Sequence, residues 1–347
     1  MKLVFAADIH LNLDEDYSFS VFEEIVSLCE SEGIENLFLG GDTFESYQDA
    51  AGFIERFNQL ISDSTLNNVF LLSGNHDIKG ADGAGLSGLP FDRKVRVIAS
   101  LPFEFVQLDE VEFLFLPFQK DISKLFTSEI PRKNQKRIVI GHGSLIDFNY
   151  EGEDEDSFYD DELFSYLEAD IVLLGHIHKS LKKGNIYYPG SSRVWRSGEE
   201  GKHGVLIVDT ENLNPKFHPL ESGGEFINLK VEVDDENYKI LNLPSEIKRN
   251  QWYLISLHGC VTNRVFIENL KERIGKKFQN SFRIEFDESD VVDVSRYYEN
   301  SLYKVFIEKW KLQYETLSDE EEKEIYRLAR KYFLEELSRV VFGSEND

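Results

Sequence analysis

Five short apolar runs in the sequence end in side chains that commonly bind metals. The motifs at these ends are DIH, GGD, GNHD, GHG and GHIH. Their candidate ligands are Asp8, His10, Asp42, Asn75, His142, His176 and His178. Imidazole, carboxylate and amide groups without a thiolate suit Mn²⁺, iron or Zn²⁺ better than the all-oxygen sites typical of Ca²⁺ and Mg²⁺. The pattern therefore predicts a site for divalent metals.

Two further side chains follow Asn75 on the same predicted turn. If Asn75 binds a metal through its amide oxygen, His76 is left to protonate or stabilise a leaving oxygen. We expect Asp77 to orient His76. Two metals about 3.5–4 Å apart can activate a water molecule and polarise a phosphoryl oxygen. Asp42 is the carboxylate that we expect to bridge them, and the motifs together indicate hydrolysis of a phosphate ester.

A single motif of this kind has a simpler explanation. DIH or GNHD alone is more often an ordinary turn or a core histidine than a metal site. Five such motifs at the ends of successive predicted strands are not independent accidents, because buried polar clusters rarely lack a role. The set as a whole therefore favours a functional site.

The motifs follow predicted strands that alternate with predicted helices. Strands are expected at 2–8, 36–42, 68–74, 136–142 and 170–176, and helices at 17–33, 48–62 and 160–168. This alternation favours βαβ units in a layered α/β domain. Because ligands bind at the carboxyl ends of strands in such sheets, the five motifs should converge. Where helices are sparse, further strands favour a partly mixed or antiparallel sheet, and they are expected at 95–98, 104–108, 111–116, 185–188 and 204–209.

The sequence predicts two smaller parts after this first domain, which we place at 1–222. Residues 223–295 are expected to form a small α+β domain, in which strands alternate with a helix. Residues 296–347 are expected to form a helical tail. In the tail, Ser318 and Glu321 have the spacing of a capping box.

The composition restricts the classes of function. The 347 residues carry a formal net charge of −26. This charge argues against tight DNA binding by the chain alone, because phosphate neutralisation supplies most of the affinity of a DNA-binding protein. The two cysteines are far apart, so no disulfide framework is expected. The first residues do not form a secretory signal and no stretch is apolar enough to cross a membrane, so we expect a cytoplasmic protein without membrane association.

The five motifs resemble those of the calcineurin-like metallophosphoesterases. A narrower resemblance lies in GHIHKSLKKGNIYYPGSSRVWRSGEEGKHGVLIVD, residues 175–209, where GHIH precedes a strand, YPGS, then a Glu and a Gly before another strand. This segment is similar to the SbcD-type nucleases. The resemblance covers residues 1–222 well and the later parts only in their order of elements. It implies an α/β fold, a layered metallophosphoesterase sandwich of mixed sheets flanked by helices, with a small α+β capping domain and a helical C-terminal tail.

The resemblance also implies roles for individual residues. It implies two Mn²⁺ ions, with iron, Zn²⁺ and Mg²⁺ as alternative metals, and a catalytic role for His76. One metal would be held by Asp8, His10, Asp42 and His178, and the other by Asp42, Asn75, His142 and His176. A nucleic-acid backbone could be contacted by Ser191, Arg193, Trp195 and Arg196. An ordinary surface loop would explain these last four residues equally well.

The function that the resemblance implies is a Mn²⁺-dependent DNA exonuclease and endonuclease subunit that acts in DNA repair and recombination. Its partners would be DNA, an SbcC-like coiled-coil ATPase and a second copy of the chain. The tail would dock on the ATPase or pack on its own domain. A small-molecule or nucleotide phosphodiesterase or phosphatase is an alternative that suits the acidic chain but leaves YPGS and the C-terminal parts unexplained. A second alternative is a scaffold for the ATPase, whose metal sites would only stabilise the fold.

Overall fold

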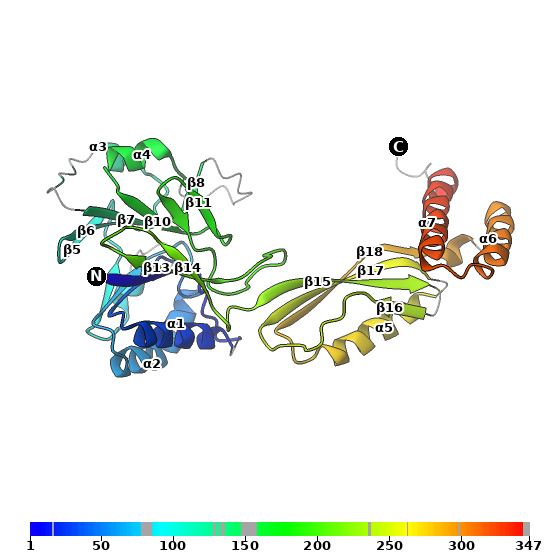
Figure 1. Cartoon of the computed structure of the whole chain (residues 1–347), viewed down its shortest axis with the longest axis horizontal. Helices are drawn as coiled ribbons and strands as arrows, with labels where there is room; N and C mark the ends of the chain where they lie inside the picture. Colours follow the sequence, from blue (N-terminus) through cyan, green and yellow to red (C-terminus); the bar gives the residue numbers. More distant parts are fainter. Residues whose placement is uncertain are drawn as a thin grey trace. The chain divides into compact units, whose positions relative to one another are not determined.

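The computed structural model consists of two compact units, residues 1–225 and 226–347, and each is described here by itself (Figure 1). The structure describes residues 1–342, except for 16, 78–84, 128–129, 131, 133–135, 147–157, 235–236, 262 and 298. The predicted metal ligands all lie within the described part of the first unit.

Two six-stranded sheets form the centre of the first unit. The first sheet, ordered β14-β13-β1-β2-β3-β4, consists of β1 (Lys2–Ala6), β2 (Asn36–Leu39), β3 (Asn68–Leu72), β4 (Val95–Ile98), β13 (Gly204–Asp209) and β14 (Lys216–Pro219). The second, ordered β11-β12-β10-β7-β6-β5, consists of β5 (Glu104–Leu108), β6 (Val111–Leu116), β7 (Lys136–His142), β10 (Ile171–Gly175), β11 (Leu181–Lys183) and β12 (Ile186–Tyr188). Each sheet combines parallel with antiparallel pairs, which confirms the predicted mixture.

Helices cover the outer face of each sheet (Figure 1). The first sheet packs against α1 (Ser18–Glu32) and α2 (Tyr47–Asp63), and the second against α3 (Ser123–Thr127) and α4 (Asp161–Tyr166). Between the sheets lies an apolar layer in which the ring of Phe38 is 4.8 Å from the rings of Phe70 and Phe113. This sequence of helix, sheet, sheet and helix layers confirms the predicted fold class.

Local signals explain where the helices begin and end. Gly33 follows α1 with a φ of 62°, a left-handed conformation that ends the helix, and its N–H is donated to Cys29 O and Glu30 O. Ser46 precedes α2, and its hydroxyl accepts the N–H of Asp49. Three short elements complete the unit, namely η1 (Leu86–Gly88), β8 (Ser144–Leu145) and β9 (Phe158–Tyr159).

A four-stranded sheet with the order β16-β15-β17-β18 forms the second unit together with helices. Its elements are β15 (Glu225–Asp234), β16 (Asn237–Ile240), β17 (Gln251–Val261), α5 (Arg264–Lys277), β18 (Arg283–Asp293), η2 (Val294–Tyr297), α6 (Ser301–Tyr314) and α7 (Glu320–Phe342). Helix α5 packs on the sheet through Ile267, Leu270 and Ile274. Leu334 and Leu337 of α7 join a separate apolar cluster around Cys260 of β17.

The start of α7 corrects one prediction. The helix begins at Glu320, and the carboxylate of Asp319 accepts the N–H of Glu321 at 2.7 Å. Asp319 therefore caps the helix in place of the predicted Ser318, because the helix starts two residues after Ser318. In the described ranges, no helix of either unit combines the length and apolar composition that crossing a bilayer requires.

A buried ion pair joins three elements of the second sheet and its helix layer. Arg137 of β7 is fully buried, and its Nε lies 2.6 Å from Oε1 of Glu112 in β6. Its Nη1 donates to the carbonyl of Leu167, just after α4, at 2.6 Å. The pair therefore holds the strand that leads to His142.

Replacing Glu112 by Ala should lower the free energy of unfolding by about 3–5 kcal/mol, because the buried guanidinium loses its counter-charge. Glu23→Ala is the matched control, since it removes a pair with Arg56 at 2.7 Å whose side chains are 45% and 52% exposed. We expect the control to cost less than about 1 kcal/mol. Urea unfolding followed by circular dichroism measures both variants, and similar small losses in the two would contradict the prediction.

Candidate metal centre

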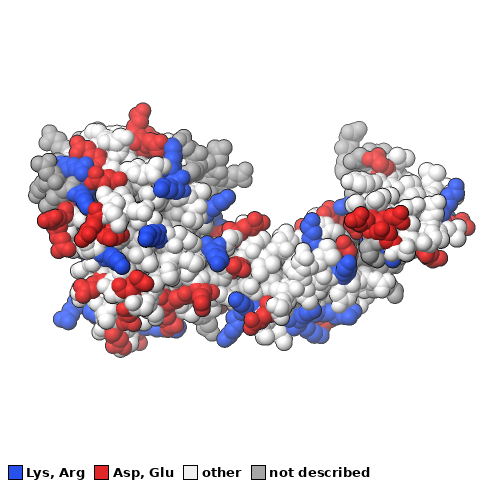
Figure 2. Space-filling view, viewed as in Figure 1, with Lys and Arg blue, Asp and Glu red and all other residues white. Residues whose placement is uncertain are grey.

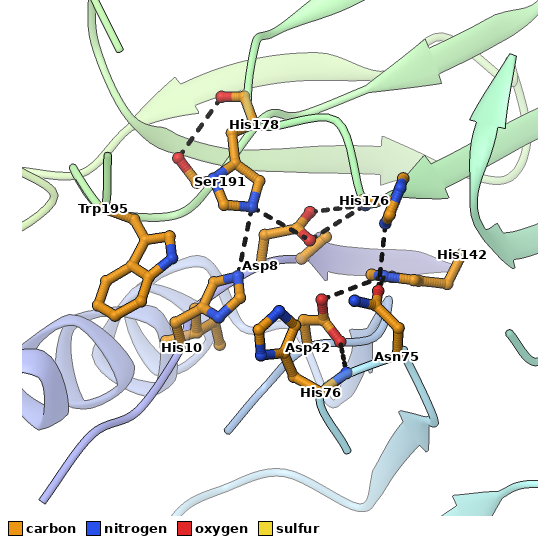
Figure 3. A network of polar contacts seen from close by, with 12 residues as sticks. Asp8, His10, Asp42, Asn75, His76, His142, His176, His178, Ser191 and Trp195 are labelled. Atoms are coloured by element: carbon orange, nitrogen blue, oxygen red, sulfur yellow. Dashed lines mark hydrogen bonds and ion pairs between the residues drawn. The ribbon is translucent and has the colours of Figure 1, made fainter. Parts of the chain in front are cut away.

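The loops that follow β1, β2, β3, β7 and β10 bring the seven predicted ligands together (Figure 3). Six of these ligands form two groups of three, and within each group the donor atoms all lie within 4.8 Å of one another. The first group is Asp8, His10 and His178, and the second is Asp42, His142 and His176. Asn75 lies beside the second group. The predicted convergence at the carboxyl ends of the strands is therefore present in the structure.

The first group is built around two imidazoles that face each other. His10 Nε2 lies 3.3 Å from His178 Nε2, and His178 Nε2 lies 3.9 Å from Asp8 Oδ1. The carboxylate of Asp8 also accepts the backbone N–H of His176 at 2.9 Å. Asp8 and His10 are fully buried. The hydrogen bond from the N–H of His176 to Asp8 connects the end of β1 in one sheet to the end of β10 in the other.

Three acceptors and two imidazoles meet in the second group. His142 Nε2 lies 3.3 Å from Asp42 Oδ2 and 3.1 Å from Asn75 Oδ1. His176 Nδ1 lies 3.2 Å from the same Asn75 oxygen. Asp42 Oδ1 accepts the backbone N–H of His76 at 2.9 Å. The bridging role of Asp42 stays a prediction, since one of its oxygens already holds this turn.

The outer nitrogens of three imidazoles are bonded to acceptors. His10 Nδ1 lies 2.8 Å from Glu45 Oε2, His178 Nδ1 lies 2.5 Å from Glu199 Oε1, and His142 Nδ1 lies 2.9 Å from Gly40 O. Because an ionised carboxylate or a carbonyl can only accept, these Nδ1 atoms carry the hydrogen and the Nε2 lone pairs point inward. Metal-binding histidines have this arrangement. The donors therefore fit divalent metals.

The second group also requires a cation on electrostatic grounds. With its Nδ1 hydrogen donated to Gly40 O, a neutral His142 would present a lone pair to the oxygens of Asp42 and Asn75. Burial by itself lowers the pKa of His142, but the charges of Asp42 and Asp8 raise that pKa to about 9. Without a metal, a proton therefore fills the place that a metal ion would take.

The two buried carboxylates of the centre differ in the direction in which their pKa values are shifted. Burial raises the pKa of Asp8 to about 6. Burial also acts to raise the pKa of Asp42, but the adjacent His142, through its charge and hydrogen bond, holds that pKa below its usual range. Burial lowers the pKa of His10 well below its ordinary value, and the nearby His178 adds to this effect. His10 is thus ready to bind a metal as a neutral imidazole.

Glycines allow the strand ends to approach each other. A Cβ on Gly74 would lie 2.2 Å from Asp42 Oδ1. A Cβ on Gly41, whose φ is +97°, would lie 2.2 Å from His142 Nδ1. Any larger residue would displace a ligand at either position, which explains the glycines in GGD and GNHD.

Glu45, rather than Asp77, contacts the predicted catalytic histidine. His76 Nδ1 lies 3.2 Å from the carbonyl oxygen of Glu45 and 3.6 Å from its Oε1. The fully buried carboxylate of Asp77 accepts the N–H groups of Gly74 at 3.0 Å and Phe44 at 3.3 Å. Asp77 therefore stabilises the turn, and the expectation that it orients His76 is corrected. Burial, with the charge of Asp42, raises the pKa of Asp77 to about 7.

The segment after YPG splits into an internal part and an exposed part. Ser191 and Arg193 are fully buried. Ser191 Oγ lies 3.0 Å from His203 Nδ1, while Arg193 donates to Ile9 O at 2.8 Å and to His10 O at 2.6 Å. The expectation that these two side chains contact a substrate backbone does not fit this burial. The guanidinium of Arg193 supports the His10 loop, and the hydroxyl of Ser191 contacts His203.

Trp195 and Arg196 lie on the outer side of the same segment. The indole of Trp195 stacks on the imidazole of His10, with centroids 5.1 Å apart and planes at 7°. Trp195 is half-buried and Arg196 is exposed. Glu199 holds both residues in place by accepting their backbone N–H groups at 2.6 Å and 2.9 Å. These two residues remain candidates for substrate contact.

No role of Glu45 or Glu199 is predicted from the sequence. Glu45 lies three positions after Asp42, and Glu199 is in the segment that carries the narrower resemblance. No local pattern marks either residue as a partner of a histidine, because the partners lie 35 and 21 positions away in the chain.

Residues 1–180 match the model of the calcineurin-like phosphoesterase family. The chain belongs to this family. The predicted enzyme class, a metal-dependent phosphodiesterase, is thereby confirmed. The DNA-directed activity and the partners go beyond what family membership shows.

Several solved structures of phosphoesterases are similar to the chain. An archaeal phosphodiesterase is 17% identical, with a TM-score of 0.37, and the match covers 63% of this chain and 100% of that one. A purple acid phosphatase from yellow lupin (Lupinus luteus) is 15% identical, with a TM-score of 0.38 and coverage of 60% and 49%. A dimetal phosphatase from Danio rerio is 11% identical, with a TM-score of 0.37 and coverage of 60% and 91%. At these TM-scores the matches do not bear on what this phosphoesterase does.

Replacing Glu199 by Gln should weaken Mn²⁺ binding to the phosphoesterase by about 10–100-fold, because His178 loses the carboxylate that orients its ring. Glu200→Gln changes an exposed neighbour and is the matched control. Calorimetric titration of the metal-free protein with Mn²⁺ measures both affinities. Wild-type affinity in Glu199→Gln would show that the contact at 2.5 Å does not support a metal ligand.

The phosphoesterase should also release protons when it binds metal. His142, with a pKa raised to about 9, is mostly protonated at neutral pH and must lose that proton to bind a cation. The apparent Mn²⁺ affinity should therefore rise with pH between 6 and 8, by up to about tenfold per pH unit for each proton released. Calorimetry in buffers of different ionisation enthalpy counts the protons, and a count of zero at pH 7 would contradict this expectation.

Proposed function

We propose that this phosphoesterase is the Mn²⁺-dependent nuclease subunit of a DNA-repair complex, a cytoplasmic homodimer that works with an SbcC-like coiled-coil ATPase. The observation that carries the proposal is a complete set of seven metal donors beside a proton donor on the accessible side of the site. The side chain of His76 is 28% exposed, whereas His10 and His142 are fully buried. A phosphodiester can therefore reach His76 while the ligands stay shielded.

The residues divide the chemistry between them. Two divalent metals, when bound, would supply an activated water and charge compensation for the phosphoryl group. Glu45 holds Nδ1 of His76 through its carbonyl at 3.2 Å. Nε2 of His76 then has no partner among the described residues, and it can donate a proton to the leaving oxygen. Asp8, His10, Asp42 and the other donors hold the metals, and Asp77 keeps the turn that carries His76 rigid.

Trp195 and Arg196 support a nucleic-acid substrate over a small ester. The indole of Trp195 is held flat against His10 at the edge of the centre, and Arg196 is exposed beside it in sequence. Aromatic side chains stack on unpaired bases and cationic side chains contact phosphates, which together guide a strand past a catalytic site. A small ester without a base would not use the stacking surface of Trp195.

The exposed apolar side chains of the helical tail favour an ATPase partner in the proposal. Helix α7 packs on its own unit through Leu334 and Leu337, which fits the alternative that the tail packs on its own domain. Ile325, Leu328 and Tyr332 of the same helix remain 64%, 44% and 63% exposed. Their spacing places them along one face of the helix. An exposed apolar stripe of this kind is suited to docking against a coiled coil.

Helix α6 also exposes apolar side chains. Leu302, Val305 and Leu312 of α6 are 61%, 55% and 65% exposed. The rings of Phe306 and Phe333 stack at 3.8 Å between the two helices, so the exposed side chains are not needed for their mutual packing. Both helices therefore offer apolar surface to one partner.

The acidity of the chain is the observation that favours a second candidate, a small-molecule or nucleotide phosphodiesterase. The formal net charge is −26. On the face drawn in Figure 2, the coloured side chains of the first unit form no continuous basic surface. A small substrate does not need such a surface, whereas DNA bound by the chain alone does. The nuclease proposal therefore assigns much of the DNA affinity to the ATPase partner.

The deciding experiment is digestion of end-labelled DNA across a Mn²⁺ titration, beside bis-p-nitrophenyl phosphate, with and without a candidate ATPase. His76→Ala should reduce cleavage of DNA by about 10²–10⁴-fold, because the leaving oxygen loses its proton donor. Calorimetry should show unchanged Mn²⁺ binding in this variant. His218→Ala, at a histidine of β14 that is not one of the predicted ligands, is the matched control and should cleave normally.

Each other outcome selects an alternative. Cleavage of the small diester but not of DNA, even with the ATPase present, would establish the small-molecule phosphodiesterase. If His76→Ala cleaves DNA as fast as the wild type, His76 is not the proton donor. If the protein binds Mn²⁺ and the ATPase but cleaves neither substrate, the result would favour the scaffold alternative.

A further inference from the structure

A cavity of about 560 Å³ lies within the second unit, and none of its described lining residues belongs to the metal centre. Its walls come from β15, β16, β17, α6 and α7. Binding sites for small molecules commonly have volumes of about 300–1,000 Å³. The cavity is therefore large enough for a ligand of the size of a nucleotide.

Cations dominate the charge of this cavity. Its lining includes Lys230, Lys239, Arg327, Arg330 and Lys331, against Glu232 and Glu324. In a chain whose formal net charge is −26, five lysines and arginines around one cavity form a local reversal of charge. Such a concentration of like charges is costly unless an anion joins it.

Two of the cations form no ion pair within the described ranges. Arg327 pairs with Glu324 at 3.2 Å, and Lys331 pairs with Asp290 at 3.1 Å. Lys230 and Lys239 are exposed, and neither forms an ion pair with any residue in the described ranges. Lys239 lies opposite Glu232 in the strand pairing of β15 with β16. These two lysines are the cations available to an incoming anion.

A histidine in the lining has an unused polar atom. His258 Nδ1 lies 2.8 Å from Asp290 Oδ2. Its Nε2 is buried and has no hydrogen-bond partner among the residues that the structure describes. A buried polar atom without a partner costs free energy, which a ligand or a water molecule can recover.

Apolar and aromatic groups complete the lining, among them Val233, Tyr238, Leu241, Tyr314 and Leu328. A simple inorganic anion would leave this surface unused, whereas an organic body would bury it. We propose that the cavity binds a small organic phosphate of about nucleotide size, with its phosphate at the lysines and its body against the apolar wall. Lysine and arginine side chains favour phosphate, because several donors can share its oxygens.

The test is calorimetric titration of the full chain, in EDTA to keep the metal centre empty, with AMP, adenosine and inorganic phosphate as probes. AMP should bind, and adenosine, which lacks the phosphate, should bind at least about tenfold more weakly. Inorganic phosphate should also bind more weakly than AMP, because it leaves the apolar wall exposed.

The double variant Lys230→Glu/Lys239→Glu should weaken AMP binding by at least about tenfold. Lys276→Glu/Lys277→Glu, on exposed positions of α5, makes the same change in net charge and should leave AMP affinity unchanged. Thermal unfolding verifies that both variants are folded. AMP should also raise the unfolding temperature of the wild type but not that of the first variant.

Three results would overturn the proposal. They are absence of AMP binding at millimolar concentration, equal affinities for AMP and adenosine, and equal losses in the two double variants. A further arm with a poly-glutamate peptide separates a second class of ligand. Binding of the peptide but not of AMP would assign the cavity to an acidic segment of a protein and overturn the small-molecule proposal.

Discussion

The metal centre depends on the contact between the two sheets of the first unit. Neither sheet carries a complete ligand set. Asp8, His10, Asp42 and Asn75 follow strands of the first sheet, whereas His142, His176 and His178 lie at or after the ends of β7 and β10. The hydrogen bond from His142 to Gly40 O crosses from one sheet to the other at 2.9 Å. The phenylalanine layer between the sheets therefore does more than stabilise the fold, since it sets the distance between two half-sites.

The strands, the layers and the convergence of the ligands could be predicted from the sequence, because they follow from hydrophobic periodicity and from motifs at strand ends. The supporting contacts were not predictable in the same way. Asp77 lies next to His76 in sequence but points its carboxylate at two backbone N–H groups, whereas Glu45 reaches His76 from another loop. Arg193 was expected to contact a substrate because arginine often binds phosphates. Its burial and its hydrogen bond to His10 O show instead that it holds the His10 loop. Such roles depend on how separate loops meet.

An acidic chain can still attract a phosphate ester if its metals dominate the field near the site. Two divalent ions would bring a formal charge of +4, and Asp8 with Asp42 would bring −2, which leaves +2 among the ligands. Glu45 and Glu199, on the outer side of the histidines, would balance this excess. The positive potential would thus be confined to the centre, where a bound ion is the largest local charge. Extended contact with DNA would need another surface.

Glu45 contacts both a predicted metal ligand and the proposed proton donor. Its Oε2 lies 2.8 Å from His10 Nδ1, and its carbonyl oxygen lies 3.2 Å from His76 Nδ1. If the ion held by His10 were lost, the His10 imidazole would be free to move. The carboxylate of Glu45 is bonded to this imidazole, so it would move as well and shift the loop beneath His76. Metal loading and acid positioning would then fail together rather than in turn.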